Sequence, residues 1–289
     1  MVWLKKKDNL RDLETHFEFG LNWLEYANKV TTKDVEESQK GLNRLLLDQS
    51  LDGKSFLDIG CGSGIHSLAA LIEGAARVVS CDIDPKSVEA TRALARKFAP
   101  SAPLQIEQKS VFDLSPADLG KFDVVYSWGV LHHTGDLYKA LNKAGEMVEH
   151  GGTFIFALYR RTWMDWFWCL EKKIYYKSKP AVKKFLQLSY IGVFRVGLFL
   201  TNRSYKTYVK NYNSKRGMNF YNDIHDWLGG WPYEAIDPEE VYIVMNKLGF
   251  KKKKMWIRKG KVFGREIGLL GSGNNEYNYQ KSGFLKSES

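Results

Sequence analysis

The sequence has few cysteines and no long uncharged hydrophobic segment. Its cysteines, Cys61, Cys81 and Cys169, are too few and too widely spaced for a disulfide framework or a zinc site. The longest apolar run, residues 185–200, is 16 residues long and contains Arg195, whereas a membrane-spanning helix needs about 20 mostly uncharged residues. The N-terminus lacks the continuous apolar stretch of a secretory signal. We therefore expect a cytoplasmic protein without disulfides, bound metal or a membrane-spanning helix.

The chain is basic, but its positive charge is concentrated in one segment. Its 289 residues carry a formal net charge of +10 at pH 7 and are 44% hydrophobic, which is enough for one large domain with an insertion. Residues 160–216 contain 14 Lys or Arg residues against only Asp165 and Glu171. The same segment holds 13 aromatic residues. This composition predicts a helical insertion whose basic side chains attract an anionic partner or are simply solvated.

The region from 55 to 158 alternates short apolar runs with helical patterns, which is typical of βαβ units around a parallel sheet. The expected strands lie near 55–59, 77–82, 104–108, 122–127 and 152–158. The expected helices between them lie near 66–73, 86–98 and 136–148. After residue 160 the alternation stops, and a helix expected at 238–248 is followed by strand-like segments at 251–258 and 274–280. The sequence therefore predicts an α/β fold with a helical insertion after the fifth strand.

The stretch FLDIGCGSG, residues 56–64, places glycines at alternate positions directly after the first expected strand. Such a density of glycine allows the backbone to approach a ligand closely, although an isolated glycine cluster is also typical of a tight turn. The spacing G-x-G-x-G differs from the G-x-G-x-x-G pattern of dinucleotide-binding folds. Asp58 precedes the glycines, and Asp82 ends the second expected strand, where it could also cap the next helix.

The order of these motifs along the chain resembles that of class I S-adenosylmethionine-dependent methyltransferases. The resemblance implies a Rossmann-like, mostly parallel sheet whose last strand is antiparallel. It also implies S-adenosyl-L-methionine as the cofactor, with S-adenosyl-L-homocysteine as its product. The glycine turn and Asp58 would contact the methionine end, Asp82 the ribose hydroxyls and Ile83 the adenine. Ser110 stands where many members of the family carry Asp. The cofactor-binding residues implied in this way are Phe19, Asp58, Gly60, Cys61, Gly62, Ser63, Asp82, Ile83, Ser110, Val111, Ser127 and Trp128.

Further motifs are similar to those of a bacterial subgroup of these enzymes that is often found among glycan-modification genes. They are HFEFGLNW at 16–23, SWGVLHHTGD at 127–136, RGMNFYNDIHDWLGGWPYE at 216–234 and GSGNNEY at 271–277. Members of the subgroup usually carry Cys at the position of Asn274 and often Tyr at the position of Trp231. The subgroup match implies an architecture rather than a particular substrate.

Histidines and acids within these motifs are candidates for proton transfer. Methyl transfer from a sulfonium is an in-line displacement, so a hydroxyl acceptor needs a base to remove its proton. His133 is the first candidate and His132 the second, because they follow the fourth strand at the carboxyl edge, where such sheets bind ligands. Either histidine could instead be a hydrogen-bonded residue at a helix start. His225 and Asp226 form a second candidate group, in which an acid would orient a base.

The segment from 221 to 234, together with the last strand, is the predicted acceptor pocket. It is dense in groups that hydrogen-bond or stack, and its glycines allow a bend. The acceptor-binding candidates are Tyr221, Trp227, Tyr233, Glu234, Asn275 and Glu276. The alternative is a structural loop in which tryptophans fill the core and acids cap the helix near Pro238.

The motifs divide the chain into five expected segments. An N-terminal helical lid is followed by the cofactor-binding core, a basic aromatic cap with the acceptor region, the elements that complete the core, and a polar tail. Their expected ranges are 1–50, 51–159, 160–235, 236–281 and 282–289. Phe19 belongs to the lid, where an apolar stripe at helical spacing is also consistent with simple packing.

Three kinds of acceptor are compatible with the basic aromatic cap. The leading hypothesis is a polar, anionic small molecule or glycan precursor that is methylated on oxygen or nitrogen. The second is tRNA or another RNA, contacted by Lys and Arg at phosphates and by aromatic rings at bases. The third is a lipid-linked acceptor, reached by laying the apolar run 185–200 on a membrane surface. A non-catalytic scaffold is disfavoured by the intact glycine turn and by both acidic positions.

Overall fold

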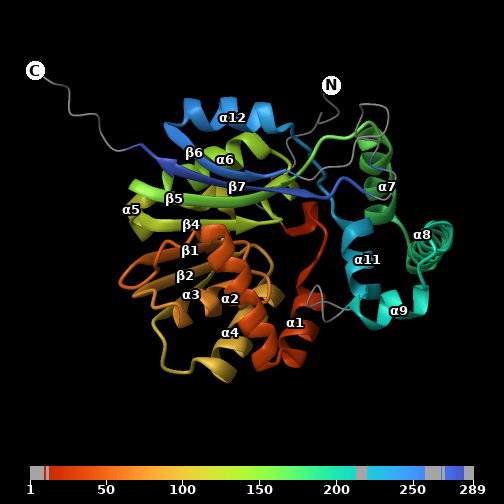
Figure 1. Ribbon diagram of the computed structural model, residues 1–289, viewed down its shortest axis with the longest axis horizontal. Helices are drawn as coiled ribbons and strands as arrows, with labels where there is room; N and C mark the ends of the chain where they lie inside the picture. Colours follow the sequence, from red (N-terminus) through yellow and green to blue (C-terminus); the bar gives the residue numbers. More distant parts are fainter. Residues whose placement is uncertain (1–9, 11–12, 213–219, 258–267, 269–270, 283–289) are drawn as a thin grey trace, which may run out of the picture.

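The structure is a computed structural model that describes residues 10, 13–212, 220–257, 268 and 271–282. Its centre is a seven-stranded sheet in the order β3-β2-β1-β4-β5-β7-β6, with helices on both faces (Figure 1). The strands are β1 (Ser55–Ile59), β2 (Arg77–Asp82), β3 (Leu104–Gln108), β4 (Phe122–Trp128), β5 (Val148–Tyr159), β6 (Phe250–Trp256) and β7 (Asn274–Lys281). Strands β1 to β5 pair in parallel, whereas β7 is antiparallel to both of its neighbours. The predicted fold class is confirmed.

The five strands expected between 55 and 158 are confirmed, with one difference at β5. This strand begins at Val148, earlier than expected, because its pairing with β4 shifts register: Phe122 pairs with Val148, and Val124 pairs with Thr153. Gly151 lies in the irregular part and has a φ of 79°. A bulge that contains two glycines resembles a turn in sequence, so the pattern predicted only the part of the strand after it.

The expected helices between the strands are also confirmed, and side-chain caps explain where several begin. Pro85 is the first residue of α4, and the Asp84 side chain accepts a hydrogen bond from the backbone N–H of Lys86 at 2.8 Å. The described helices outside residues 160–235 are α1 (Gly20–Lys29), α2 (Thr32–Leu46), α3 (Ile65–Ile72), α4 (Pro85–Phe98), α5 (Pro116–Leu119), α6 (Leu137–Glu146) and α12 (Pro238–Lys247). Three short 3-10 helices are η1 (Leu13–Thr15), η2 (Val111–Asp113) and η3 (Leu131–His133).

The two faces of the sheet build two hydrophobic cores. Successive residues of β1 alternate between them: Leu57 and Ile59 join the core beneath α6 and α12, and Phe56 joins the core beneath α2 and α3. All three side chains are buried. Burying one such side chain contributes roughly 1.5–3 kcal/mol to stability, so the two cores hold the sheet rigid at the edge where the site lies.

Four helices from the second half of the chain form a cap beside the sheet (Figure 1). They are α7 (Asp165–Lys177), α8 (Pro180–Leu200), α9 (Tyr205–Lys210) and α11 (Phe220–Gly229). Their inward side chains form an aromatic cluster that includes Tyr175, Tyr212 and Phe220 and that also receives Phe17 from the N-terminal segment. The segment is helical, as its loss of strand alternation predicts. Within the part of the chain that the structure describes, none of the helices is both long and apolar enough to cross a bilayer.

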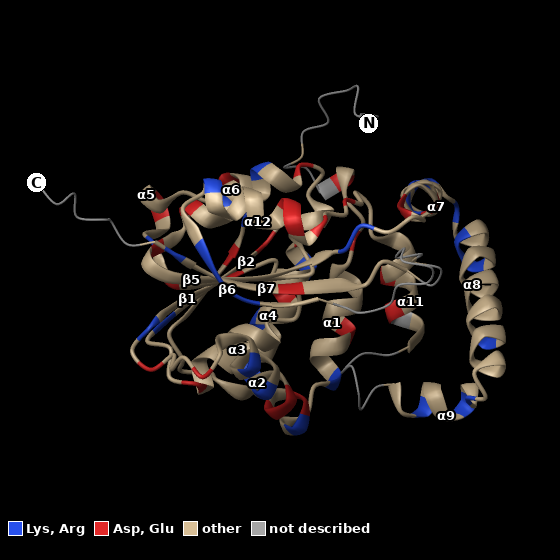
Figure 2. Cartoon of the chain, turned by 45° about the horizontal axis from the view of Figure 1, so that its top comes forward, with Lys and Arg blue, Asp and Glu red and all other residues tan. Residues whose placement is uncertain are grey.

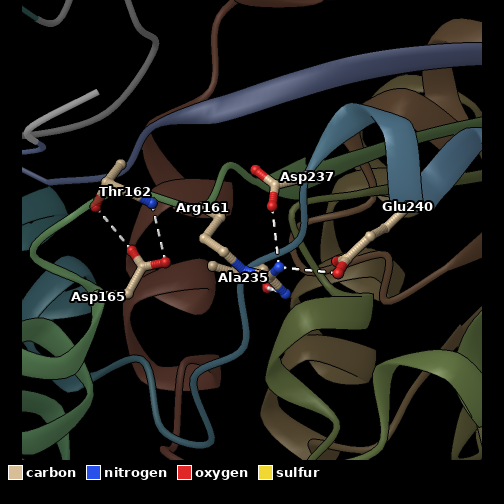
Figure 3. Close-up of polar contacts among 6 residues, drawn as sticks. All are labelled: Arg161, Thr162, Asp165, Ala235, Asp237 and Glu240. Atoms are coloured by element: carbon tan, nitrogen blue, oxygen red, sulfur yellow. Dashed lines mark hydrogen bonds and ion pairs between the residues drawn. The ribbon is translucent and has the colours of Figure 1, made fainter. Parts of the chain in front are cut away.

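A polar junction fixes the cap to the sheet at the end of β5 (Figure 3). The Arg161 guanidinium donates from Nη1 to Asp237 and to Glu240, both at 2.9 Å, and so joins the start of the cap to α12. Beside it, the backbone N–H and the hydroxyl of Thr162 donate to the Asp165 carboxylate at 2.9 and 2.8 Å. These contacts set the direction in which the cap leaves the sheet.

Candidate functional site

A cavity of about 1450 Å³ opens at the edge of the sheet where β1 to β5 end. The segments after these strands contribute lining residues, and so does the start of β7, which reaches the same edge because it runs antiparallel. Helices α1 and α11 line it as well. Open α/β sheets bind ligands at this edge, so the geometry marks the cavity as the candidate site.

The glycine turn after β1 forms the floor of the cavity. Gly60 and Gly62 have φ values of 73° and 56°, a left-handed conformation that side chains rarely tolerate. A Cβ atom on Gly60 would lie 2.4 Å from the Val130 side chain, and one on Gly62 would lie 2.9 Å from the Trp23 ring. The turn then feeds directly into the N-terminus of α3, whose unpaired N–H groups favour polar or anionic ligand atoms.

Replacing Gly60 with alanine should lower the free energy of unfolding by roughly 2–5 kcal/mol, because left-handed strain adds to the collision with Val130. Gly53 is the matched control: its φ is 68°, but a Cβ there meets nothing within 4 Å, so Gly53→Ala should cost only about 1–2 kcal/mol. Urea denaturation measures both. Equal losses for the two variants would show that the turn has room for a side chain.

Two carboxyls, that of buried Asp58 and that of half-buried Asp82, flank the glycine turn. The Asp58 side chain accepts a hydrogen bond from the Ser67 hydroxyl at 2.5 Å, and burial raises the pKa of Asp58 to about 7. Burial also raises the pKa of Asp82, to about 6, although the backbone N–H groups of Asp84 and Gly62 favour its ionised form. Asp82 therefore holds the glycine turn and the β2–α4 loop together with the same carboxylate that faces the cavity.

Apolar side chains line the part of the cavity near the glycine turn and Asp82. Ile83 and Val111 line it, and Trp23 and Tyr26 of α1 close it from the N-terminal side. Ser110 also lines it, but its hydroxyl accepts the backbone N–H of Phe112 at 3.3 Å and caps η2. These apolar side chains offer surfaces on which a flat aromatic base can pack.

The residues of the predicted cofactor set line the cavity with one exception. The lining members are Phe19, Asp58, Gly60, Cys61, Gly62, Ser63, Asp82, Ile83, Ser110, Val111 and Trp128. Ser127 is not among the lining residues, because its hydroxyl is buried and donates to the backbone carbonyl of Ile59 at 3.0 Å. Its side chain joins β4 to β1 instead.

Two adjacent histidines from η3 line the other half of the cavity. Nδ1 of His133 lies 2.7 Å from the carbonyl oxygen of Pro232, which can only accept, so Nδ1 carries the proton and Nε2 carries a lone pair. In His132 the backbone N–H of Tyr159 donates to Nδ1 at 3.3 Å, which places the proton on Nε2. Burial lowers the pKa of both rings, that of His133 to about 3, so both are neutral at physiological pH.

Asp226 faces the histidine half from α11. Its Oδ1 accepts a hydrogen bond from the Asn22 side chain of α1 at 2.5 Å, whereas Oδ2 has no partner among the described residues. Burial, assisted by the nearby charge of Asp223, raises the pKa of Asp226 to about 8 against the lowering effect of the hydrogen bond from Asn22. The group therefore ionises within the physiological range, which suits it to proton transfer.

Several residues that line the cavity also have buried polar atoms that lack hydrogen-bond partners within the described ranges. They are Tyr126 Oη, His132 Nε2, Asp226 Oδ2, Trp227 Nε1 and Asn274 Oδ1. Leaving a buried polar group unpaired costs roughly 1–3 kcal/mol, so a cluster of five requires an explanation. A polar ligand that supplies both donors and acceptors satisfies them together.

Glu276 at the start of β7 also lines the cavity, but its charge is paired. Arg44 of α2 donates to both carboxylate oxygens at 2.9 Å, and the Trp128 indole N–H donates to Oε1 at 3.0 Å. This bidentate pair links the lid region, β4 and β7 around one side of the cavity. Glu276 therefore forms part of the cavity wall as a paired carboxylate, not as an unpaired charge.

Other members of the predicted acceptor set do not line the cavity, and their contacts show why. The Tyr233 hydroxyl donates to Asp165 at 3.0 Å, and Glu234 accepts the backbone N–H of Leu137 at 3.0 Å. The catalytic candidate His225 does not line the cavity either, because it lies in hydrogen-bond contact with Tyr175 and Gln187 inside the cap. Tyr221 is 51% exposed on the outer side of α11. Asn275 is buried in β7 with its side chain off the cavity. These residues fit the alternative of a structural segment.

Lys172 is a residue of the site that the sequence pattern did not suggest. It is fully buried in α7, donates to the Trp227 carbonyl and places its ammonium 3.7 Å from the centre of the Trp227 ring. Burial lowers the pKa of Lys172 to about 7. Its place in a run of lysines suggested a solvated side chain. In the structure it instead contacts Trp227, which lines the cavity. Residues 213–219 lie outside the described residues. They include residues 216–219, the first four of the motif RGMNFYNDIHDWLGGWPYE.

Comparison with known proteins agrees with this geometry. Residues 57–156, which span β1 to most of β5, match the family described as methyltransferase domain. The whole chain shares its fold with the S-adenosylhomocysteine-bound magnesium protoporphyrin IX methyltransferase of Synechocystis, with a TM-score of 0.50 at 14% identity over 86% of this chain and 84% of that one. Residues 57–156 are thus similar to methyltransferase domains, and the chain has the Rossmann-like fold of that S-adenosylhomocysteine-bound enzyme.

Two curated relatives each match about one third of this chain. The tRNA U34 carboxymethyltransferase of Alcanivorax borkumensis is 40% identical over 107 residues, which are 34% of this chain and 32% of that protein. The ribosomal protein L11 methyltransferase of Pectobacterium carotovorum is 40% identical over 97 residues, 33% of this chain and 32% of the relative. The chain spans about one third of the length of these relatives. Their names indicate two different acceptors, a tRNA and a ribosomal protein.

Proposed function

We propose that the protein is an S-adenosylmethionine-dependent methyltransferase that methylates a small, polar, anionic acceptor, such as a glycan precursor, on oxygen or nitrogen. The observation that carries the proposal is the single cavity that joins the glycine turn to the cluster of unpaired polar atoms. One half has the features of a nucleoside site, and the other offers several separate hydrogen-bonding groups to a polar molecule. The two halves meet, as direct transfer between two bound molecules requires.

In the proposed complex the cofactor lies across the ends of β1 and β2. Asp82 accepts hydrogen bonds from the ribose hydroxyls, while Ile83 and Val111 lie against the adenine. The glycine turn and Asp58 lie at the methionine end, which directs the methyl group toward the histidine half. The Trp23 and Tyr26 side chains of α1 cover the nucleoside from outside.

In the proposed reaction the acceptor's nucleophilic atom attacks the methyl carbon as the carbon–sulfur bond breaks, and the bonding electrons remain on the sulfur. Asp226 takes the acceptor's proton, because Oδ2 is unpaired among the described residues and its pKa lies near neutrality. Nε2 of His133 accepts a hydrogen bond from the acceptor, and Nε2–H of His132 donates one. The neutral histidines thus orient the acceptor without adding a charge that would repel the sulfonium.

RNA is the second candidate acceptor, favoured by the basic cap and by the tRNA-modifying relative. That relative and the ribosomal-protein enzyme match equally well over the shared domain, so the match favours neither acceptor. Incubation of the protein with a labelled methyl donor and separate pools of nucleotide sugars, glycans and tRNA distinguishes the candidates. Label in the tRNA pool alone would reject our proposal in favour of RNA.

Cofactor binding can be tested before any acceptor is known. At 100 times its Kd, S-adenosylhomocysteine should stabilise the fold by about 2.7 kcal/mol and raise the Tm by roughly 5–10 °C. Differential scanning fluorimetry measures this shift, with adenosine monophosphate as the control nucleotide. A Tm unchanged by saturating S-adenosylhomocysteine would refute the proposed function whatever the acceptor.

We also propose a division of labour along the chain. Residues 1–50 act as the lid, 51–159 as the cofactor-binding core, 160–235 as the acceptor cap and 236–281 as the part that completes the sheet. Support comes from α1, which packs on α4 and reaches Asp226 in the cap through Asn22. Residues 1–9 of the lid and 283–289 of the tail lie outside the described residues.

A further inference from the structure

The outer side of the cap carries a large apolar surface. On α8 it is formed by Val182, Phe185, Leu188, Val193, Val196, Phe199 and Leu200, and on and before α7 by Trp163, Trp166, Phe167, Leu170 and Ile174. Phe199 and Leu200 are 81% and 77% exposed, and Phe185, Trp166 and Trp163 are 64–68% exposed. Few soluble proteins leave so many large apolar side chains in water on adjoining helices. We call these residues the cap surface.

The cap surface is not the side of α8 that packs against the rest of the cap. The opposite side of α8 already packs into the aromatic cluster of the cap through Leu186, Tyr190, Ile191, Phe194 and Leu198. The helix is therefore apolar on both sides although it lies at the outer edge of the molecule in both ribbon views (Figures 1 and 2). A helix that is apolar all round is normally covered on all sides, so the outer side calls for an apolar partner.

The charges around the α8 part of the cap surface have one sign. From Lys172 to Asn222 the sequence contains no Asp or Glu. Figure 2 shows Lys and Arg positions, in blue, along α8 and α9. Those in the described part of this stretch, apart from the buried Lys172, are Lys173, Lys177, Lys179, Lys183, Lys184, Arg195, Arg203, Lys206 and Lys210. Their long stems can lie along apolar surface while the charged ends reach a neighbouring polar layer.

We propose that the cap surface docks on the surface of a bilayer that contains anionic lipids. The apolar side chains of α7 and α8 enter the interface, the tryptophans lie at its polar boundary, and the flanking lysines meet the headgroups. RNA fits less well, because Val and Leu side chains do not stack on bases. A second copy of the chain fits less well, because two segments of the same strong positive charge would face each other.

The inference is independent of the proposed acceptor. None of the exposed cap-surface residues lines the cavity, so membrane docking leaves both halves of the site open to ligands. It goes beyond the methyl-transfer reaction because it assigns the protein a place to work. Failure of docking would leave the cofactor-binding result untouched, and the two tests are therefore distinguishable.

Sedimentation of the full-length protein with vesicles tests the docking. The protein should bind vesicles of phosphatidylcholine with about 30% phosphatidylglycerol at least tenfold more tightly than vesicles of phosphatidylcholine alone, and high salt should weaken that binding. The double variant Phe199→Ser/Leu200→Ser should lose about tenfold or more of the affinity. Ile243→Ser is the matched control, because Ile243 is 51% exposed on α12, outside the cap surface.

Three results would overturn the proposal. The first is absence of binding to the anionic vesicles, and the second is equal binding by the wild type and the double variant. The third is a stable dimer in light scattering that the double variant disrupts, since a second copy would then cover the cap surface. The Tm shift with S-adenosylhomocysteine verifies that both variants remain folded, so loss of binding cannot be ascribed to unfolding.

Discussion

Asp82→Ala is expected to weaken S-adenosylhomocysteine binding by about 100-fold or more, as measured by isothermal titration calorimetry. Two charge-assisted hydrogen bonds to ribose are lost, each worth roughly 1.5–3 kcal/mol. The same change removes the carboxylate that accepts the backbone N–H groups of Gly62 and Asp84, so the glycine turn also loses its anchor. The effect is therefore larger than that of a residue that touches only the ligand.

The pH dependence of cofactor binding provides a second readout of Asp82. Burial raises its pKa to about 6, and the proposed ribose contacts favour the ionised form. Affinity should thus fall as the pH drops through about 6, and Asp82→Ala should abolish this dependence. Glu107→Ala is the matched control, because Glu107 lies on the neighbouring strand β3 and does not line the cavity. Wild-type affinity in Asp82→Ala would contradict the assignment.

Asp226→Asn is expected to lower kcat by about 100-fold or more once an acceptor is in hand, with cofactor affinity unchanged. The amide keeps the shape of the side chain but cannot take a proton. In the wild type, kcat should rise with pH up to about 8, because the raised pKa keeps Asp226 protonated below that value. Tyr221→Phe on the same helix is the control and should leave kcat unchanged, since Tyr221 does not line the cavity.

Asn22→Ala distinguishes proton transfer from a purely structural role of Asp226. The hydrogen bond from Asn22 lowers the pKa of Asp226, so its loss should move the midpoint of the pH–rate profile upward. A structural role predicts no such movement. If kcat of Asp226→Asn kept the wild-type pH profile, the base would have to be another group, and His133→Gln would be the next variant to measure.

The first half of the fold was predictable because its signals are local. Most strands there are short apolar runs, and adjacent residues encode the glycine turn and the helix start at Asp84–Pro85. The irregular start of β5 was missed for the same reason: the glycines at 151 and 152 read as a turn when only their neighbours are considered. Local pattern therefore gave the cofactor half with near-correct boundaries.

The acceptor half depends on contacts between distant residues, which no local pattern encodes. Asn22 and Asp226 are 204 positions apart in sequence. Glu234 accepts a hydrogen bond from the backbone N–H of Leu137, 97 positions away, and does not line the cavity. Composition correctly placed Asp226 and Trp227 in a polar, aromatic segment. It could not tell which side of α11 faces the cavity, and so Tyr221 and His225 were included as well.

The position of β7 bears on the order in which the protein can form during synthesis. This strand is the last to leave the ribosome, yet it lies between β5 and β6 and supplies Asn274 and Glu276 to the cavity. The nascent domain can therefore assemble its nucleoside pocket early, while β5 remains an open edge that invites pairing with other chains. Insertion of the final strand closes that edge and completes the acceptor wall in a single step.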